Sequence, residues 1–142
     1  MSGTSSLDTP QIVLGFDYGK VRTGIAVGQS ITGTATALTT LTSRNQKPDW
    51  EGIATLIKEW QPDALVVGIP VHMDGSEQEM TEAARKFGRQ LHGRFNLPIY
   101  EAEERLSSME AEQQLGKDCD KAAIDREAAR LILQSWLEQQ GR

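Results

Sequence analysis

The sequence predicts a single α/β domain built around a mixed five-stranded sheet with helices on both faces. Three β-prone segments come first along the chain, and after residue 49 helical and strand patterns alternate. A strand meander followed by alternating helices and strands is typical of a sheet that joins an antiparallel part to a parallel part. The length of 142 residues suits one domain of ordinary size.

The antiparallel meander is expected near the start of the domain. Residues 1–10 contain neither a cationic start nor an apolar block, so we expect a disordered polar tail and no signal peptide. The domain should then occupy residues 11–142. The apolar run Ile12–Phe16 suits a strand buried on both faces, and Thr23–Gln29 suits a returning strand. The threonine-rich segment Thr34–Thr42 supplies the third strand.

The pattern then changes to a helical period. Asp49 is a candidate N-cap for a helix that Pro62 stops. A buried strand is expected over Ala64–Gly68, a second helix over Glu77–Arg94 and a fifth strand over Pro98–Ala102.

Two more helices are predicted after the fifth strand. Ser107 and Glu110 have the spacing of a capping box, which indicates a short helix. After a polar loop, the segment Ile124–Gln140 predicts a long helix. Its inward face should hold Ala128, Ala129, Ile132, Leu133 and Trp136.

Charge and cysteine content limit the classes of function. A formal net charge of −5 and a pI of about 5.0 argue against a protein held to nucleic acid by bulk charge. They are compatible with an acidic site offset by metal and a local basic face. Cys119 is the single cysteine, so an internal disulfide and a cysteine metal cluster are ruled out. The apolar runs are too short to span a bilayer. We therefore expect a cytoplasmic protein with no membrane partner.

Acidic residues stand at the ends of three predicted elements. Asp17 closes the first strand beside Gly19, Glu103 and Glu104 follow the fifth strand, and Asp125 begins the last helix. Each has an ordinary explanation as a turn residue or as an acid that complements a helix dipole. Together, at one end of the sheet, they would form an oxygen-only site for a hard cation such as Mg²⁺. Two such ions can clamp the attacking and leaving oxygens of a phosphodiester.

Five segments share a pattern with a known family. They are Asp17–Val27, Val67–Glu77, Phe87, Glu104–Ser108 and Ile124–Gln134. In this order they resemble the YqgF family, also called RuvX, over nearly everything after the tail. The resemblance implies a ribonuclease H-like fold and a nuclease that matures the 5′ end of pre-16S ribosomal RNA; the family has also been described as a Holliday junction resolvase. It further implies that Asp17, Glu104 and Asp125 are the catalytic acids and hold Mg²⁺ or Mn²⁺, as two ions.

Three features depart from the family's pattern. Glu103 stands where the family usually has Asp, and His72 stands where Asn is common. The loop Gly116–Ala123 is only modestly basic, with Lys117 and Lys121, whereas family members often carry more Lys and Arg there. These departures leave open how position 72 and this loop contact a substrate.

Two groups of cationic residues are candidates for contacting nucleic acid. Arg85, Arg89 and His92 share the outer face of the second long helix, where a merely solvated face is the simpler explanation. Arg22 and Arg105 each lie next to a candidate acid. Either arginine would neutralise a carboxylate or hold a phosphate bidentately, and we favour phosphate for Arg22.

Three interpretations of function follow. The leading one is a metal-dependent nuclease that acts on RNA rather than DNA and associates with ribosome precursors, with junction cleavage as its alternative. The second is a nucleic-acid or ribosome-precursor binding module that cuts poorly. The third, an actin-like nucleotide-binding fragment, ranks last because the chain is too short for the second lobe of that fold. The sequence leaves the oligomeric state open.

Overall fold

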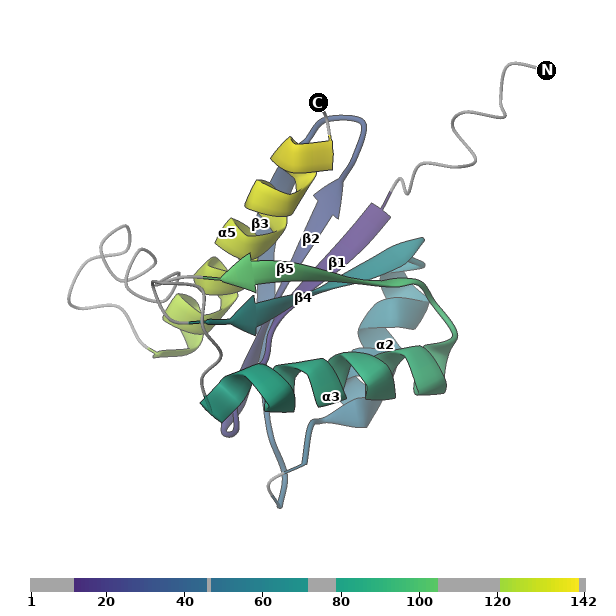
Figure 1. The fold of residues 1–142 in the computed structure, drawn as a ribbon. Helices are drawn as coiled ribbons and strands as arrows, with labels where there is room; N and C mark the ends of the chain where they lie inside the picture. The colour runs from purple at the N-terminus through teal and green to yellow at the C-terminus, as the bar shows by residue number, and fades with distance from the viewer. Residues whose placement is uncertain (1–11, 46, 72–78, 105–120, 141–142) are drawn as a thin grey trace.

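The computed structural model describes residues 12–45, 47–71, 79–104 and 121–140 (Figure 1). Within these ranges the chain forms five strands and three helices. The strands are β1 (Ile12–Asp17), β2 (Arg22–Gln29), β3 (Thr34–Thr42), β4 (Ala64–Pro70) and β5 (Ile99–Glu104). The helices are α2 (Trp50–Trp60), α3 (Glu79–Phe95) and α5 (Lys121–Gln140).

The strands form one sheet in the order β3-β2-β1-β4-β5 (Figure 1). The pairs β1–β2 and β2–β3 are antiparallel, whereas β1–β4 and β4–β5 are parallel. The predicted combination of an antiparallel meander with parallel strands is confirmed. Because β1, β4 and β5 run in the same direction, their carboxyl ends meet at one end of the sheet, where folds of this kind bind ligands.

Helices cover both faces of the sheet, as predicted. α5 packs on one face, while α2 and α3 pack on the other (Figure 1). Successive side chains of β1 point to opposite faces of the sheet. Leu14 and Phe16 therefore pack in the core beneath α2 and α3, and Val13 packs beneath α5. Gly15 brings α5 close to the sheet, since a Cβ there would lie 2.8 Å from the Cβ of Leu133.

Local interactions set both ends of α2. The Asp49 carboxylate accepts a hydrogen bond from the Gly52 N–H at 3.1 Å, so its predicted role as N-cap is confirmed. At the other end Gln61 adopts a left-handed conformation, with φ of 47°, and its N–H donates to the Ile57 carbonyl at 2.8 Å. The helix has therefore already ended before Pro62.

Strands β4 and β5 extend two residues further than predicted. Local sequence ended them at Gly68 and Ala102, but they continue together, with Ile69 opposite Glu103 and Pro70 opposite Glu104. Pairing between strands stabilises positions whose own preference for extended structure is weak. The two glutamates consequently belong to β5 instead of following it.

Helix α5 begins at Lys121, three residues before the predicted start at Ile124. The Thr40 hydroxyl donates to the Ala122 carbonyl at 2.5 Å, which attaches the first turn of the helix to β3. Asp125 is therefore beyond the first turn, where a helix dipole has little effect. All five residues predicted for the inward face of the helix are buried.

Some expectations fall on residues that the structure does not describe. The tail over 1–10, the short helix at Ser107 and Glu110, His72, Arg105 and the loop up to residue 120 lie outside the described ranges. Among the helices that the structure does describe, none is long and apolar enough to cross a membrane.

Candidate active site

Asp17 is the last residue of β1 and lies on the face of the sheet that α5 covers. Alternate residues of a strand share a face, and in β1 the row Val13, Gly15 and Asp17 includes two positions that contact α5. Asp17 is directly opposite Gly24 in β2. Its side chain is half-buried at the carboxyl end of the strand. A carboxylate at this position is therefore directed toward the layer that contains α5.

Asp125 reaches the same place from the other end of the chain. A Cβ at Gly24 would overlap the Asp125 carbonyl oxygen and would lie 2.9 Å from the Arg126 nitrogen. The backbone of α5 thus rests directly on β2 at Gly24, the residue that pairs with Asp17. This role of Gly24 was not predicted from sequence, although a glycine inside a strand can indicate that another backbone approaches closely.

Arg22, the first residue of β2, is paired with Asp125. Its Nε donates to the Asp125 Oδ2 at 2.6 Å, and the two side chains are 31% and 24% exposed. No other hydrogen bond of this guanidinium is found among the described residues. A charge-assisted bond of this length in a partly buried setting is stronger than an ordinary surface ion pair. Within the chain Arg22 thus contacts a carboxylate, and its contact with a substrate phosphate stays a prediction.

Positions 103 and 104, the last two of β5, belong to alternate rows of the strand. Glu103 lies opposite Ile69, which belongs to the core beneath α2 and α3, so Glu103 is on the face away from α5. Position 104 falls in the alternate row with Ala102, which packs against the α5 core. β4 stands between β1 and β5, and position 104 lies two residues beyond Ala102, the residue level with Asp17, so the backbones at Asp17 and Glu104 are roughly 12 Å apart.

The structure describes the backbone of Glu104 and not its side chain. Among the side chains that are described, no three His, Cys, Asp or Glu residues form a group that could hold a metal ion. The arrangement observed is therefore a pair of aspartates, Asp17 and Asp125, on one face of the sheet, with Glu104 at the end of a nearby strand.

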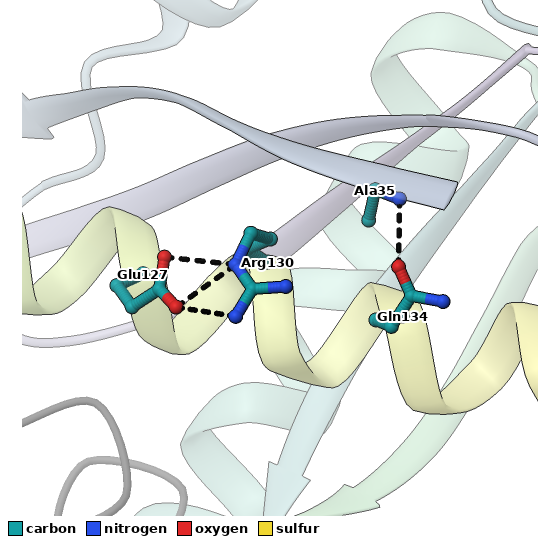
Figure 2. Close-up of polar contacts among 4 residues, drawn as sticks. All are labelled: Ala35, Glu127, Arg130 and Gln134. Carbon is teal, nitrogen blue, oxygen red and sulfur yellow. Dashed lines mark hydrogen bonds and ion pairs between the residues drawn. The ribbon is translucent and has the colours of Figure 1, made fainter. Parts of the chain in front are cut away.

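Polar contacts join α5 to the sheet and link neighbouring turns of the helix itself (Figure 2). The Gln134 amide accepts from the Ala35 N–H at 2.9 Å and donates to the Gly33 carbonyl at 2.7 Å, so it holds the turn between β2 and β3. Glu127, two residues after Asp125, accepts a shared hydrogen bond from the Arg130 Nε, which lies 2.8 Å from each of its carboxylate oxygens. Hydrogen bonding to Glu127 raises the pKa of Arg130 further above its ordinary value. Sequence analysis identified none of these contacts.

Arg85 and Arg89 have acidic partners on the opposite face of the sheet. The Arg85 Nε lies 3.9 Å from Glu101 of β5, and the Arg89 Nη2 lies 3.0 Å from Glu82 of the same helix. These pairs offset part of the positive charge for which the two arginines were selected. At 1.5 Å per helical residue, Arg85 and Arg89 lie roughly 9 and 15 Å along α3 from the first residue of that helix, Glu79.

Two comparisons place this chain among known proteins by sequence. A family model described as "RuvX: Holliday junction resolvase" matches residues 11–139. A protein of Hydrogenovibrio crunogenus named "Putative pre-16S rRNA nuclease" is 49% identical over 127 residues, which cover 89% of this chain and 93% of that one. A protein of Pseudomonas fluorescens strain Pf-5 with the same name is 48% identical over 135 residues, covering 91% and 93%.

Solved structures agree on the fold. RuvC of Thermus thermophilus, solved with a Holliday junction substrate, matches with a TM-score of 0.57 at 14% identity, covering 92% of this chain and 96% of that one. The fowlpox virus resolvase, solved with Holliday junction DNA, matches with a TM-score of 0.55 at 11% identity, covering 93% and 100%. At these identities the likeness concerns the fold alone.

The sheet order, the helix layers and these neighbours define the class: the protein has a ribonuclease H-like fold of the RuvC type. The sequence match then identifies the family. The chain belongs to the RuvX family of nucleases, as its resemblance implied.

Proposed function

We propose that this protein is a metal-dependent nuclease whose Asp17, Glu104 and Asp125 hold Mg²⁺ or Mn²⁺ as two ions. The observation that carries the proposal is the direct contact of the α5 backbone with β2 at Gly24, which brings the segment of Asp125 beside Asp17. The donors available there are carboxylate oxygens, the ligands that hard divalent cations prefer. A divalent cation also suits the charge of this site, because partly buried carboxylates are costly unless a positive charge compensates them.

Each residue has a separate role in this proposal. When bound, the metal ions activate water and stabilise charge on the phosphodiester. Asp17 is held by the end of a buried strand and Asp125 by a helix docked on the sheet, so both carboxylates are presented by rigid elements. The position of Glu104 in the row of Ala102 supports Glu104, rather than Glu103, as the third acid. Arg22 lies next to Asp125 and is suited to bind a substrate phosphate.

RNA is the substrate that we propose, and in particular the 5′ end of pre-16S ribosomal RNA. The support is the name shared by relatives that are 47–49% identical over most of the chain. Such a role implies association with ribosome precursors in the cytoplasm. Holliday junction cleavage is the second candidate, since the family model is described in those words and two structural neighbours were solved with junction DNA.

A cleavage assay tests the proposal and separates the two substrates. The protein is incubated with Mg²⁺ or Mn²⁺ and either a pre-16S RNA fragment or a four-way DNA junction. We expect cleavage of the RNA that stops when the metal is chelated. The variants Asp17→Asn and Asp125→Asn keep side-chain shape but lose the charge that holds the cation, so activity should fall at least 100-fold in each.

Stability and a control complete the design. Asp125 lies beyond the first turn of α5, so its replacement should cost no helix cap. Loss of the ion pair with Arg22 should lower the melting temperature by only a few degrees. Glu59→Gln, at an exposed position of α2, changes the net charge by the same amount and should cut normally. Wild-type rates in Asp125→Asn would refute the metal site, and cleavage of the junction alone would refute RNA as the substrate.

A further inference from the structure

The contact between Arg22 and Asp125 couples two binding events at the proposed site. We infer that Arg22 and the divalent cation compete for the Asp125 carboxylate, and that a phosphate of the substrate ends this competition by drawing Arg22 away. The inference rests on the proposed function. It adds that the protein binds its metal tightly only when nucleic acid is present.

The first step concerns the contact that the Asp125 carboxylate makes within the chain. Oδ2 accepts from the Arg22 Nε at 2.6 Å, and less than a third of either side chain is exposed. A cation that uses this oxygen must displace the guanidinium or bind beside it. Either event costs free energy, because a charge-assisted hydrogen bond is lost or two positive charges come close. Arg22 should therefore weaken metal binding.

The second step concerns what a phosphate offers to Arg22. The guanidinium has five donors, and one of them, on Nε, is used in its contact with Asp125. A phosphodiester accepts two parallel hydrogen bonds from such a group, which a single carboxylate oxygen does not. Arg22 can thus exchange Asp125 for a phosphate without being left unpaired. Asp125 is then available to the cation, so the two ligands favour each other's binding.

The structure favours exchange over a permanent ion pair for a reason of position. Arg22 is the first residue of β2, opposite Thr42 of β3, and its side chain is 31% exposed, so its guanidinium is within reach of a ligand at the surface. Glu127 and Arg130, by contrast, are one helical turn apart on α5 and share several hydrogen bonds. The pair Glu127–Arg130 is a structural contact within one helix. The pair Arg22–Asp125 joins residues 103 positions apart at the proposed site.

The test measures metal affinity instead of activity. Mn²⁺ is titrated into the full-length protein by calorimetry, with and without a phosphorothioate RNA oligonucleotide that resists cleavage. In the wild type we expect RNA to tighten Mn²⁺ binding about tenfold, the size of a typical coupling between sites. In Arg22→Gln we expect Mn²⁺ alone to bind about tenfold more tightly than in the wild type, with no further gain from RNA. Because the coupling is reciprocal, Mn²⁺ should tighten RNA binding in each protein by the same factor by which RNA tightens Mn²⁺ binding.

Two further variants make the result specific. Arg126→Gln removes the same charge from the residue next to Asp125 and should keep the wild-type coupling. Arg22→Lys retains a positive charge near Asp125 and should keep Mn²⁺ binding weak without RNA, which shows that the effect is not misfolding. Mn²⁺ affinity that is unchanged or weaker in Arg22→Gln overturns this inference alone. Absence of Mn²⁺ binding in every form of the protein overturns the proposed metal site as well.

Discussion

Replacement of Gly24 by alanine should disrupt the site while the rest of the core stays intact. The added methyl group would overlap the Asp125 carbonyl oxygen and crowd the Arg126 nitrogen. Both atoms belong to the backbone of α5, so no change of rotamer relieves the overlap. The helix must instead move away from β2, by about 1 Å or more, to restore an ordinary contact distance.

The expected cost follows from this geometry. Overpacking of a buried site costs about 1–3 kcal/mol, and the upper end applies because the obstacle is backbone. For a domain of this size, about 3 kcal/mol lowers the melting temperature by roughly 10 °C. The displacement also separates Asp125 from Asp17, and misplacement of catalytic groups by 1 Å can reduce activity about 100-fold. Activity should therefore fall far more than stability explains.

Two glycines provide matched controls. A Cβ at Gly28 would lie 2.7 Å from the Leu137 Cδ1 and 3.0 Å from the Leu133 Cδ2, which are the ends of flexible side chains remote from the site. It would lie 3.2 Å from one backbone atom, the Thr34 carbonyl oxygen, a far smaller conflict than at Gly24. Gly28→Ala should cost about 1 kcal/mol and keep its activity. Gly93, in α3, has open space around it, so Gly93→Ala should stabilise the protein by about 0.5–1 kcal/mol.

Thermal unfolding followed by circular dichroism, together with cleavage assays below the transition, measures both effects. The reasoning is refuted if Gly24→Ala melts and cuts like the wild type. It is also refuted if Gly24→Ala and Gly28→Ala lose activity equally.

Other perturbations address the substrate surface and the core. Joint replacement of Arg85 and Arg89 by Glu should weaken RNA binding and flatten its salt dependence by roughly two phosphate contacts, as measured by fluorescence anisotropy; an unchanged slope would remove α3 from the binding surface. Leu133 is fully buried where α5 meets β1 and β2, so Leu133→Ala should lower the free energy of unfolding by about 2–5 kcal/mol in urea titrations. A loss below 1 kcal/mol would mean that α5 packs more loosely than described.

The elements with strong local signals were predicted well from sequence. The strand over Thr34–Thr42 has the predicted bounds, and Asp49 caps the helix that follows. The inward face of α5 was also correct, because burial of one helical face leaves a periodic pattern. The errors occur at boundaries that depend on partners, such as the extension of β5 to Glu104 opposite Pro70.

The candidate site was harder to predict because its contacts are distant in sequence. Asp17 and Asp125 each have an ordinary local explanation, and the family resemblance is what singled them out. The helix-dipole explanation for Asp125 is weakened by the early start of α5 at Lys121, which no local signal indicated. The pairing of Arg22 with Asp125 could not be derived from periodicity, since 103 positions separate them.

The docking of α5 on the first hairpin also determines when activity can arise during folding. Asp17 and Arg22 are among the first residues of the domain to be synthesised, and Asp125 is among the last. Contacts of such long sequence separation form late, because loop closure must precede them. A nascent chain that has released only β1 through β5 would hold two members of the proposed acid set but would lack the third. The nuclease we propose would thus stay inactive until its last helix has left the ribosome and packed onto the sheet.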